Sequence, residues 1–369
     1  MKKIDANLVN INDIDMRQLL GREEVVLDKY AISEFISNRT ILVTGGAGSI
    51  GSELCRQIAK FKPYKLVILD IYENALYDLQ QELLRTYPAL NFEVTVASVR
   101  DSKRIKRVFN KYRPEIVFHA AAHKHVPLME LDPWEAIKNN IKGTYTVATI
   151  ANDFNVKKFV LISTDKAVNP TNVMGATKRF CEMIIQALQP MSKTEYSAVR
   201  FGNVLGSNGS VVPLFKKQIA QGGPITLTHK DVTRYFMTIP EAAQLILQSG
   251  TFAKGGETFI LDMGKSVKIY DLAKNMIMLS GLEPEKDIKI EIVGLRPGEK
   301  LYEELLMDGE LKGTSHEKIF IAKSGEFNLC ELNRYISDLL DAAELEDVNK
   351  LKSILKKAVP TYTGGLNND

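Results

Sequence analysis

Residues 40–61 read TILVTGGAGSIGSELCRQIAKF, and this stretch decides the fold. An apolar, β-branched run from Ile41 to Val43 leads into a glycine turn, and apolar residues then recur at helical spacing from Ile50 onward. The pattern predicts a strand, a tight turn and a helix in that order. This unit is the one from which open parallel sheets are built.

Three glycines, Gly45, Gly48 and Gly51, form a G-x-x-G-x-x-G triplet in the predicted turn. The first permits the turn, the second lets the backbone approach a pyrophosphate, and the third lets helix and strand pack closely. The helix N-terminus, with Ser49 and Ile50 in its first turn, would face the phosphates. The triplet therefore predicts a dinucleotide site, and the alternative is an ordinary tight turn between strand and helix.

Asp70 ends the next predicted strand, KLVILD. A carboxylate at this place would accept hydrogen bonds from the adenine ribose hydroxyls of a dinucleotide. No lysine or arginine lies from Leu66 to Leu84, and Glu73 adds a second acid there. Because a 2′-phosphate would meet acids and no basic partner, we expect NAD rather than NADP.

Strand and helix patterns alternate outward from this stretch. The predicted strands are 65–70, 92–98, 115–122 and 157–164, and the predicted helices are 74–87, 101–112, 134–155 and 174–190. Apolar strands alternating with helices predict an α/β fold, a doubly wound Rossmann-type parallel sheet covered on both faces. After residue 201 the alternation weakens and Pro and Gly cluster at 222–224 and 295–298, which predicts a smaller C-terminal substrate-binding lobe.

We therefore expect three parts along the chain. They are an N-terminal arm at 1–38, an NAD-binding Rossmann domain at 39–200, and mainly a substrate-binding lobe at 201–369, with some segments returning to the Rossmann domain. The net charge of +3 over 369 residues is too small to predict a nucleic-acid partner. The three cysteines are far apart without zinc spacing, so we expect no metal. The sequence contains no 18-residue apolar run.

Several longer motifs resemble those of the extended short-chain dehydrogenase/reductase family. They are TGGAGSIG (44–51), HAAAHKHVP (119–127), NNIKGT (139–144), an M-x-x-x-K segment (174–178) and RFGNVLGSNGSVVPLF (200–215). Two more, STDKAVNPTNVMGATK (163–178) and LRPGEKLYEEL (295–305), resemble the bacterial nucleotide-sugar 4,6-dehydratases that act on UDP-N-acetylglucosamine. The resemblance covers about residues 39 to 305 and implies an NAD-dependent enzyme.

In the wider family a Thr or Ser, a Tyr and a Lys perform the redox step, and the matching residues here are Thr164, Met174 and Lys178. A methionine has no ionisable proton and cannot serve as the base. Some members of the narrower group resemble this chain in having Met at this position, so Met174 does not by itself exclude activity. Lys178 would bind the nicotinamide ribose.

Asp165 and Lys166 directly follow Thr164. In the implied reaction the C4 hydroxyl of the sugar is oxidised, which acidifies the C5 proton. Lys166 would take that proton, and Asp165 would protonate the leaving C6 hydroxyl. These roles require a lowered pKa for Lys166 and a raised pKa for Asp165, and burial favours both changes. The acceptor of the C4 hydroxyl proton stays open between Thr164, Asp165 and water.

The remaining expected site residues follow from the matched motifs. The expected cofactor-binding residues also include Ser98, Val99, Ala120 and Ala122. The expected substrate-binding residues are Lys124, Asn203, Arg234, Arg296 and Glu299. An arginine fork suits the diphosphate and Glu299 could accept from ribose hydroxyls, whereas His123 and His125 are expected to be structural.

The predicted function is a UDP-N-acetylglucosamine 4,6-dehydratase for bacterial surface glycans. The alternatives are a UDP-sugar 4-epimerase and an inactive dinucleotide-sensing protein, and the C5 configuration of the product stays open. We expect a cytoplasmic protein, or the cytoplasmic catalytic part of a membrane-anchored one. Apolar residues on the helix at 174–190, namely Met183, Ile184, Ala187 and Leu188, predict a homo-oligomer that associates through this helix.

Overall fold

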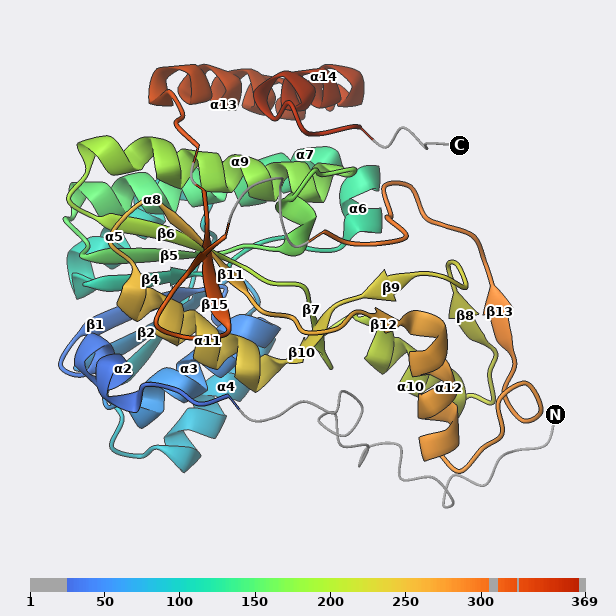
Figure 1. The fold of residues 1–369 in the computed structure, drawn as a ribbon. Helices are drawn as coiled ribbons and strands as arrows, with labels where there is room; N and C mark the ends of the chain where they lie inside the picture. Colours follow the sequence, from blue (N-terminus) through green and yellow to red (C-terminus); the bar gives the residue numbers. More distant parts are fainter. Residues whose placement is uncertain (1–24, 305–310, 324, 365–369) are drawn as a thin grey trace.

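The computed structural model describes residues 25–304, 311–323 and 325–364 (Figure 1). Most of the predicted N-terminal arm lies outside this range. Its described part ends in helix α2 (Lys29–Ile36), where the Asp28 carboxylate accepts a hydrogen bond from the Ala31 N–H and so begins the helix.

A nine-stranded sheet forms the centre of the described chain, in the order β14-β15-β11-β6-β5-β4-β1-β2-β3. The strands are β1 (Thr40–Thr44), β2 (Lys65–Asp70), β3 (Phe92–Val96), β4 (Ile116–His119), β5 (Lys158–Ile162), β6 (Glu195–Arg200), β11 (Glu257–Leu261), β14 (Lys312–Gly313) and β15 (Ile319–Ala322). All neighbours from β3 to β11 pair in parallel, and β15 pairs antiparallel with β11 and with β14. The predicted doubly wound parallel sheet is therefore confirmed.

The strand order reverses direction at β1, which lies between β2 and β4. Ligands of doubly wound sheets bind in the crevice outside the carboxyl ends of the strands at such a point. Strand β1 is buried along its whole length, as expected for an apolar strand covered on both faces.

Helices cover both faces of the sheet (Figure 1). One face packs against α2, α3 (Ser49–Lys60), α4 (Glu73–Thr86) and α11 (Ile239–Phe252). The other packs against α5 (Ser102–Tyr112), α8 (Gly143–Asp153) and α9 (Val173–Leu188), with the short α6 (Val126–Leu131) and α7 (Pro133–Ala136) beside them. The predicted single helix at 134–155 is in fact α7, a π-helical turn (Ile137–Lys142) and α8.

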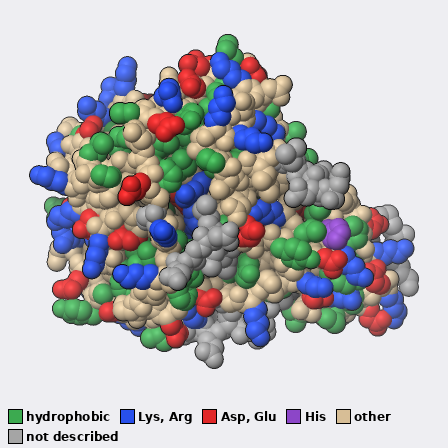
Figure 2. Space-filling model, turned by 45° about the horizontal axis from the view of Figure 1, so that its top comes forward, with side chains coloured by type: hydrophobic (Ala, Val, Ile, Leu, Met, Phe, Trp, Pro, Cys, Tyr) green, Lys and Arg blue, Asp and Glu red, His purple; other side chains and the backbone are tan. Residues whose placement is uncertain are grey.

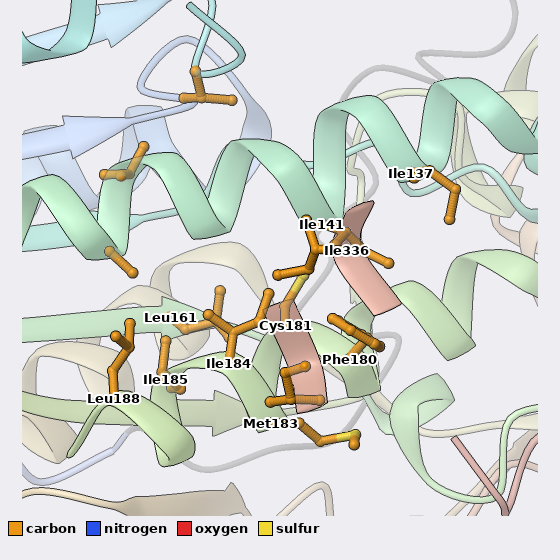
Figure 3. Close-up of a cluster of buried hydrophobic side chains, with 14 of the residues drawn as sticks. Ile137, Ile141, Leu161, Phe180, Cys181, Met183, Ile184, Ile185, Leu188 and Ile336 are labelled. Carbon is orange, nitrogen blue, oxygen red and sulfur yellow. The ribbon is translucent and has the colours of Figure 1, made fainter. Parts of the chain in front are cut away.

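A helical hairpin of α13 (Leu329–Glu344) and α14 (Val348–Ala358) forms a further layer outside α9 (Figure 1). Ile336 of α13 points into the same apolar cluster as Phe180 and Cys181 of α9 (Figure 3).

The hairpin corrects the expected association surface. The predicted residues Met183, Ile184, Ala187 and Leu188 are all buried within the chain. The expectation that this helix leaves apolar surface for a second subunit is therefore wrong, because the C-terminal helices of the same chain cover it.

A smaller lobe, which we define as residues 203–238 and 263–292, lies beside the carboxyl ends of the strands. Strand β7 (Asn203–Leu205) pairs with β10 (Phe236–Thr238), β8 (Ile225–Leu227) with β13 (Ile290–Ile292), and β9 (Thr233–Arg234) with β12 (Val267–Lys268). Together with α10 (Val211–Ala220) and α12 (Ile269–Leu279) they enclose a separate apolar core that includes Phe215 and Met276. Strands β11 and β15 belong to the large sheet, and a domain boundary at residue 200 stays a prediction.

The surface seen in Figure 2 mixes Lys and Arg with Asp and Glu side chains. Such mixing is typical of a solvated surface. Within the described ranges, no helix combines the length and the apolar composition that crossing a membrane requires.

Candidate active site

A cavity of about 490 Å³ lies where the glycine turn, the ends of β4 and β5, and the smaller lobe meet. It gathers residues from distant parts of the chain at the reversal of strand order. The predicted residues that line it are Gly45, Gly48, Ser49, Ile50, Gly51, Ala120, Ala122, Lys124, Thr164, Lys166, Met174, Lys178 and Asn203.

The glycine turn has the geometry that a pyrophosphate needs. Gly45 has a φ of +66°, and a Cβ there would lie 2.5 Å from the Ala121 backbone nitrogen. A Cβ on Gly51 would overlap the Gly45 carbonyl. At Gly48 only the Gly45 carbonyl oxygen would lie within 4 Å of an added Cβ, at a tight 3.3 Å, and Gly48 itself lines the cavity. Gly48 also begins α3 without a capping side chain, which leaves the first N–H groups of the helix for an anion.

Asp70 has a structural partner in this turn. Its carboxylate accepts hydrogen bonds from the Ala47 N–H and the Tyr72 N–H, each at 2.9 Å. Asp70 is not part of the cavity lining, and neither are Ser98 and Val99. The Ser98 hydroxyl accepts from the Arg100 N–H, and Val99 is buried. A cofactor role for these three residues stays a prediction.

Lys178 is a buried amine that faces the cavity. It lines the cavity at 4% exposure and makes no hydrogen bond or ion pair with any residue that the structure describes. Burial lowers the pKa of Lys178. The Lys178 amine is thus a donor without a described partner in a cavity that Ala120 and Ala122 also line. It fits a ligand whose hydroxyl oxygens can accept hydrogen bonds, such as the ribose of a dinucleotide.

Thr164, Asp165 and Lys166 form a hydrogen-bonded cluster after β5. The Thr164 hydroxyl donates to Asp165 Oδ1 at 2.9 Å, and the Lys166 amine donates to the same oxygen at 3.0 Å. The Asp165 side chain is 1% exposed, and its other oxygen, Oδ2, is buried without a hydrogen-bond partner. An unpartnered carboxylate oxygen is costly in a dry site, so this oxygen suits a proton or a ligand hydroxyl.

The charge state of Lys166 differs from the expectation. Burial acts to lower the pKa of Lys166, but the carboxylates of Asp165 and Glu303 outweigh burial and raise this pKa above its ordinary value. The predicted lowering of the Lys166 pKa is therefore wrong for this arrangement. The physical reason is the pair of carboxylates beside the amine: Asp165 Oδ1 lies 3.0 Å and Glu303 Oε1 lies 3.4 Å from the Lys166 Nζ.

Met174 lines the cavity from the first turn of α9. Its side chain is buried, and the Asn172 side chain caps this helix by accepting from the Gly175 N–H at 2.8 Å. Lys178 follows one helical turn later, on the same face of the helix. The M-x-x-x-K spacing thus brings a methionine and a lysine into the cavity, and no proton-transfer group replaces the tyrosine on this helix turn.

The predicted substrate residues divide into two groups. Lys124 and Asn203 line the cavity, and Asn203 accepts a hydrogen bond from Lys166 at 3.1 Å. Arg234 and Glu299 lie behind the lining and approach each other at 3.4 Å. The side chain of Arg296 is exposed, outside the cavity lining, and its backbone N–H donates to Glu299.

Some lining residues were not predicted. They come from the glycine-rich segment at 201–211, from the histidines and from α6, and include Phe201, Gly202, Ser207, Gly209, His125 and Leu128. Glu303, which bridges Lys166 and Arg234, was also missed. The segment at 201–211 lies in the motif RFGNVLGSNGSVVPLF, and Glu303 lies in LRPGEKLYEEL. Their position inside a recognised motif could have indicated that these residues belong to the site. Within the described part of the chain, no group of three or more metal-ligating side chains gathers.

The doubly wound sheet and the glycine-lined cavity are those of the extended short-chain dehydrogenase/reductase fold. A family model described as "Polysaccharide biosynthesis protein" matches residues 41–324. The chain belongs to this family.

Three curated relatives show the range of proteins that this chain resembles. It is 55% identical over 345 residues to the capsular polysaccharide biosynthesis protein CapD of Staphylococcus aureus, covering 93% of this chain and 57% of that protein. It is 35% identical over 272 residues to a UDP-N-acetylglucosamine 4,6-dehydratase (inverting) of Campylobacter jejuni, covering 72% and 77%. It is 33% identical over 341 residues to a UDP-glucose 4-epimerase of Rickettsia canadensis, covering 85% and 95%.

Among solved structures, Pen from Bacillus thuringiensis is 35% identical with a TM-score of 0.72, covering 82% of this chain and 99% of that one. The chain spans little more than half the length of the Staphylococcus aureus relative.

Proposed function

We propose that this chain is an NAD-dependent UDP-N-acetylglucosamine 4,6-dehydratase that makes a UDP-4-keto-6-deoxy-N-acetylhexosamine for surface glycan synthesis. The observation that supports this most is the Asp165–Lys166 pair at the cavity. Oxidation alone needs one base, whereas elimination of water from C5 and C6 needs a base and an acid together.

NAD is the proposed cofactor because the glycine turn, the uncapped start of α3 and the buried amine of Lys178 fit a dinucleotide. Asp70 lies at the end of β2, where it favours ribose hydroxyls over a 2′-phosphate. When bound, NAD would accept hydride from C4 of the sugar and return it at C6.

The chain's own residues would move two protons: one from the C4 hydroxyl to the C6 hydroxyl, and one from C5 and back to C5. The hydrogen bond from Thr164 to Asp165 supports a route for the C4 hydroxyl proton through Thr164 to the Asp165 carboxylate. Asp165 would then give a proton to the C6 hydroxyl, which leaves as water. Lys166 would take the C5 proton and return it to C5 after the C5=C6 bond has formed and been reduced. Asp165 and Lys166 end in the protonation states in which they began.

Lys166 must begin this cycle as a neutral amine. In the arrangement described here its ammonium form is stabilised by two carboxylates. The reaction therefore requires that this stabilisation weaken, or that only the neutral fraction of Lys166 react.

A UDP-sugar 4-epimerase is the second candidate, favoured by the similarity to the Rickettsia protein. Epimerisation does not use an acid at C6, and it relies on the tyrosine position that Met174 occupies. A dehydratase uses the whole Thr164–Asp165–Lys166 cluster, so the site favours the first candidate.

Mass spectrometry of UDP-N-acetylglucosamine after incubation with the protein and NAD tests the proposal. Loss of one water supports a dehydratase. An unchanged mass with a new chromatographic isomer indicates an epimerase, and an unchanged sugar contradicts both enzymes.

A further inference from the structure

Glu303 is a buried carboxylate between the predicted diphosphate-binding arginine and the predicted base. Its side chain is 5% exposed, and its Oε1 lies 3.4 Å from Lys166 Nζ and 3.7 Å from Arg234 Nε. Arg234 is itself held by the backbone carbonyls of Thr233 and Leu301. Burying a carboxylate costs free energy unless the charge is paired. Glu303 is paired, because a cation lies on each side of it.

The segment at 298–304 is fixed to the loop that precedes α9. The Gly298 carbonyl accepts hydrogen bonds from the side chains of Thr171 and Asn172 at 2.9 and 3.1 Å. Lys300 donates to the Val168 carbonyl at 3.3 Å. These contacts place Glu303 against Lys166 and leave it little freedom to turn away.

Lys166 has three acceptors within reach of its amine: Asp165, Asn203 and Glu303. An ammonium has three N–H donors; two of them donate to Asp165 and Asn203, and Glu303 lies 3.4 Å away as an ion-pair partner, so this arrangement stabilises the charged form. A neutral amine would need to turn its lone pair toward the substrate, and it has only two N–H donors for three acceptors. The two carboxylates therefore favour the form of Lys166 that cannot act as a base.

Four charged groups face the Lys166 amine from the elements around it. Asp165 precedes it in the chain, Glu303 comes from the 298–304 segment, Arg234 from β9 and Lys124 from the loop after β4. The two cations oppose the charge on Lys166 and the two carboxylates favour it. Asp165 already has a proposed role as the acid. Glu303 has none, and its only described partners are Lys166 and Arg234.

We propose that Glu303 is a positioning residue that holds Lys166 at the cavity and sets the pH at which Lys166 becomes a base. The role of Lys166 as a base rests on the proposed function, whereas the effect of Glu303 on the Lys166 amine does not. Burial lowers the pKa of Lys166, but the carboxylates of Asp165 and Glu303 outweigh burial and raise this pKa, so removing one carboxylate must lower it.

The first test measures Lys166 without any substrate. Acetic anhydride acylates neutral amines and not ammonium ions, so the rate of Lys166 acetylation at a fixed pH of about 9, followed by peptide mass spectrometry, reports its neutral fraction. In the Glu303→Gln variant this rate should rise about tenfold or more, the low end for removing an opposite charge at such a distance.

The matched control is Glu304→Gln, because Glu304 is the next residue, is 51% exposed on its side chain and pairs with Lys300 instead. It should leave the Lys166 rate unchanged. If Glu303→Gln does not fold, Glu303→Asp keeps the charge but withdraws it by one methylene, and should raise the rate by a smaller factor. A Lys166 rate equal to wild type in a folded Glu303 variant, or a slower one, overturns the proposal.

The second test uses the reaction. The rate of water loss from UDP-N-acetylglucosamine should rise with pH as Lys166 deprotonates, and Glu303→Gln should move this rise to lower pH while Glu304→Gln does not. A merely structural role would lower the rate at every pH without moving the profile, and that result contradicts the proposal. If wild type removes no water at all, the proposed function fails, and the acetylation rates still decide the role of Glu303.

Discussion

Met174 occupies the place where the wider family has a proton-transferring tyrosine, and we propose that its neighbours provide the missing chemistry. The Thr164 hydroxyl, the Asp165 carboxylate and the Lys166 amine are joined by hydrogen bonds of 2.9 and 3.0 Å. Met174 lines the same cavity but offers no ionisable group. At the scale of single residues, we therefore propose that the cluster after β5 performs the proton transfers, whereas Met174 lines the cavity without taking part in them.

This assignment predicts a ranking of three variants. Asp165→Asn keeps the size of the side chain but cannot deliver a carboxylic proton, and Lys166→Ala removes the C5 base. Each should lower turnover by about 100- to 10,000-fold, the usual range for a positioned acid or base. Met174→Leu conserves volume and moves no proton, so its turnover should stay within about tenfold of wild type. Steady-state rates of water loss measure all three.

The opposite ranking would contradict the assignment. If Met174→Leu abolishes turnover while Lys166→Ala retains it, the chemistry belongs elsewhere. The two slow variants should also differ, because Asp165→Asn can still accumulate a 4-ketone that retains its C6 hydroxyl.

Single residues were predictable where they are close in the sequence. Thr164, Asp165, Lys166, Met174 and Lys178 come from one motif, and four of these line the cavity while Asp165 lies directly behind it. The pKa direction of Lys166 was predicted wrongly, because burial was weighed without the opposing carboxylates of Asp165 and of Glu303, and Glu303 approaches from a distant segment. Arg296 shows the converse, since its motif is recognisable but its side chain is exposed outside the cavity lining.

At the scale of elements, two glycines of the same turn should affect different properties: Gly48 the binding of NAD, and Gly51 the stability of the fold. Gly48→Val places a branched side chain on the open side of the turn, where a pyrophosphate would lie. We expect calorimetry to show loss of NAD binding, with a thermal unfolding midpoint close to wild type. Gly51→Val is the matched comparison, and it should lose stability because its Cβ overlaps the Gly45 carbonyl. Unchanged NAD affinity in Gly48→Val would contradict the placement of the phosphates.

Helix α9 is anchored to the sheet by a buried ion pair. Glu182 accepts two hydrogen bonds from Arg200 of β6 at 2.7 and 2.6 Å and a third from the Ser163 hydroxyl at 2.6 Å. Burial acts to raise the pKa of Glu182, but Arg200 and its other partners outweigh burial and lower it to about 2. The anchor lies one turn beyond Lys178, so it also fixes the part of α9 that faces the cavity.

Glu182→Gln should therefore lower the free energy of unfolding by about 3–5 kcal/mol, because it leaves the Arg200 charge buried without a counter-charge. Glu182 binds its proton less readily in the folded state, so its contribution is complete above the ordinary carboxylate pKa of 4.5 and is lost as pH falls toward about 2. Urea unfolding between pH 7 and pH 3 measures both effects. The control is Glu93→Gln, because Glu93 is partly exposed and its ion pairs with Lys65 and Lys111 lie near the surface. An equal small loss in both variants would contradict the role of the pair.

Elements were predictable where a repeating apolar pattern defines them. The parallel strands up to β6 and their helices follow from runs such as KLVILD and KKFVLIST. The return of β11 to the sheet beside β6, and the antiparallel β15 beyond it, depend on pairing between distant segments. A short apolar strand does not show which partner it will pair with, so the order of these edge strands required the structure.

At the scale of the whole molecule, the C-terminal hairpin completes the core. Helices α13 and α14 pack on the outer face of α9 and α7 (Figure 1). Lys352 of α14 pairs with Glu130 at 2.8 Å, and Glu130 also accepts from the Val173 N–H at the start of α9. The hairpin therefore shields an apolar face and helps to hold the helix that contains Met174 and Lys178.

Removing the hairpin should expose that face. A chain ended after residue 323 would uncover the apolar residues of α9 that the hairpin contacts, and light scattering should show a larger associated mass than for the whole chain at the same micromolar concentration. The whole chain measured in parallel is the reference. Equal mass distributions for both chains would contradict the shielding role.

The central claim is that the Asp165–Lys166 pair removes water from UDP-N-acetylglucosamine. The most direct measurement is the mass of the sugar product formed in deuterated water and quenched early, with purified product returned to deuterated water as the exchange control. The account predicts a product that has lost one water and gained deuterium at C5, because the Lys166 amine exchanges its protons with deuterated water and returns a deuteron to C5. A product of unchanged mass without deuterium at C5 would contradict it.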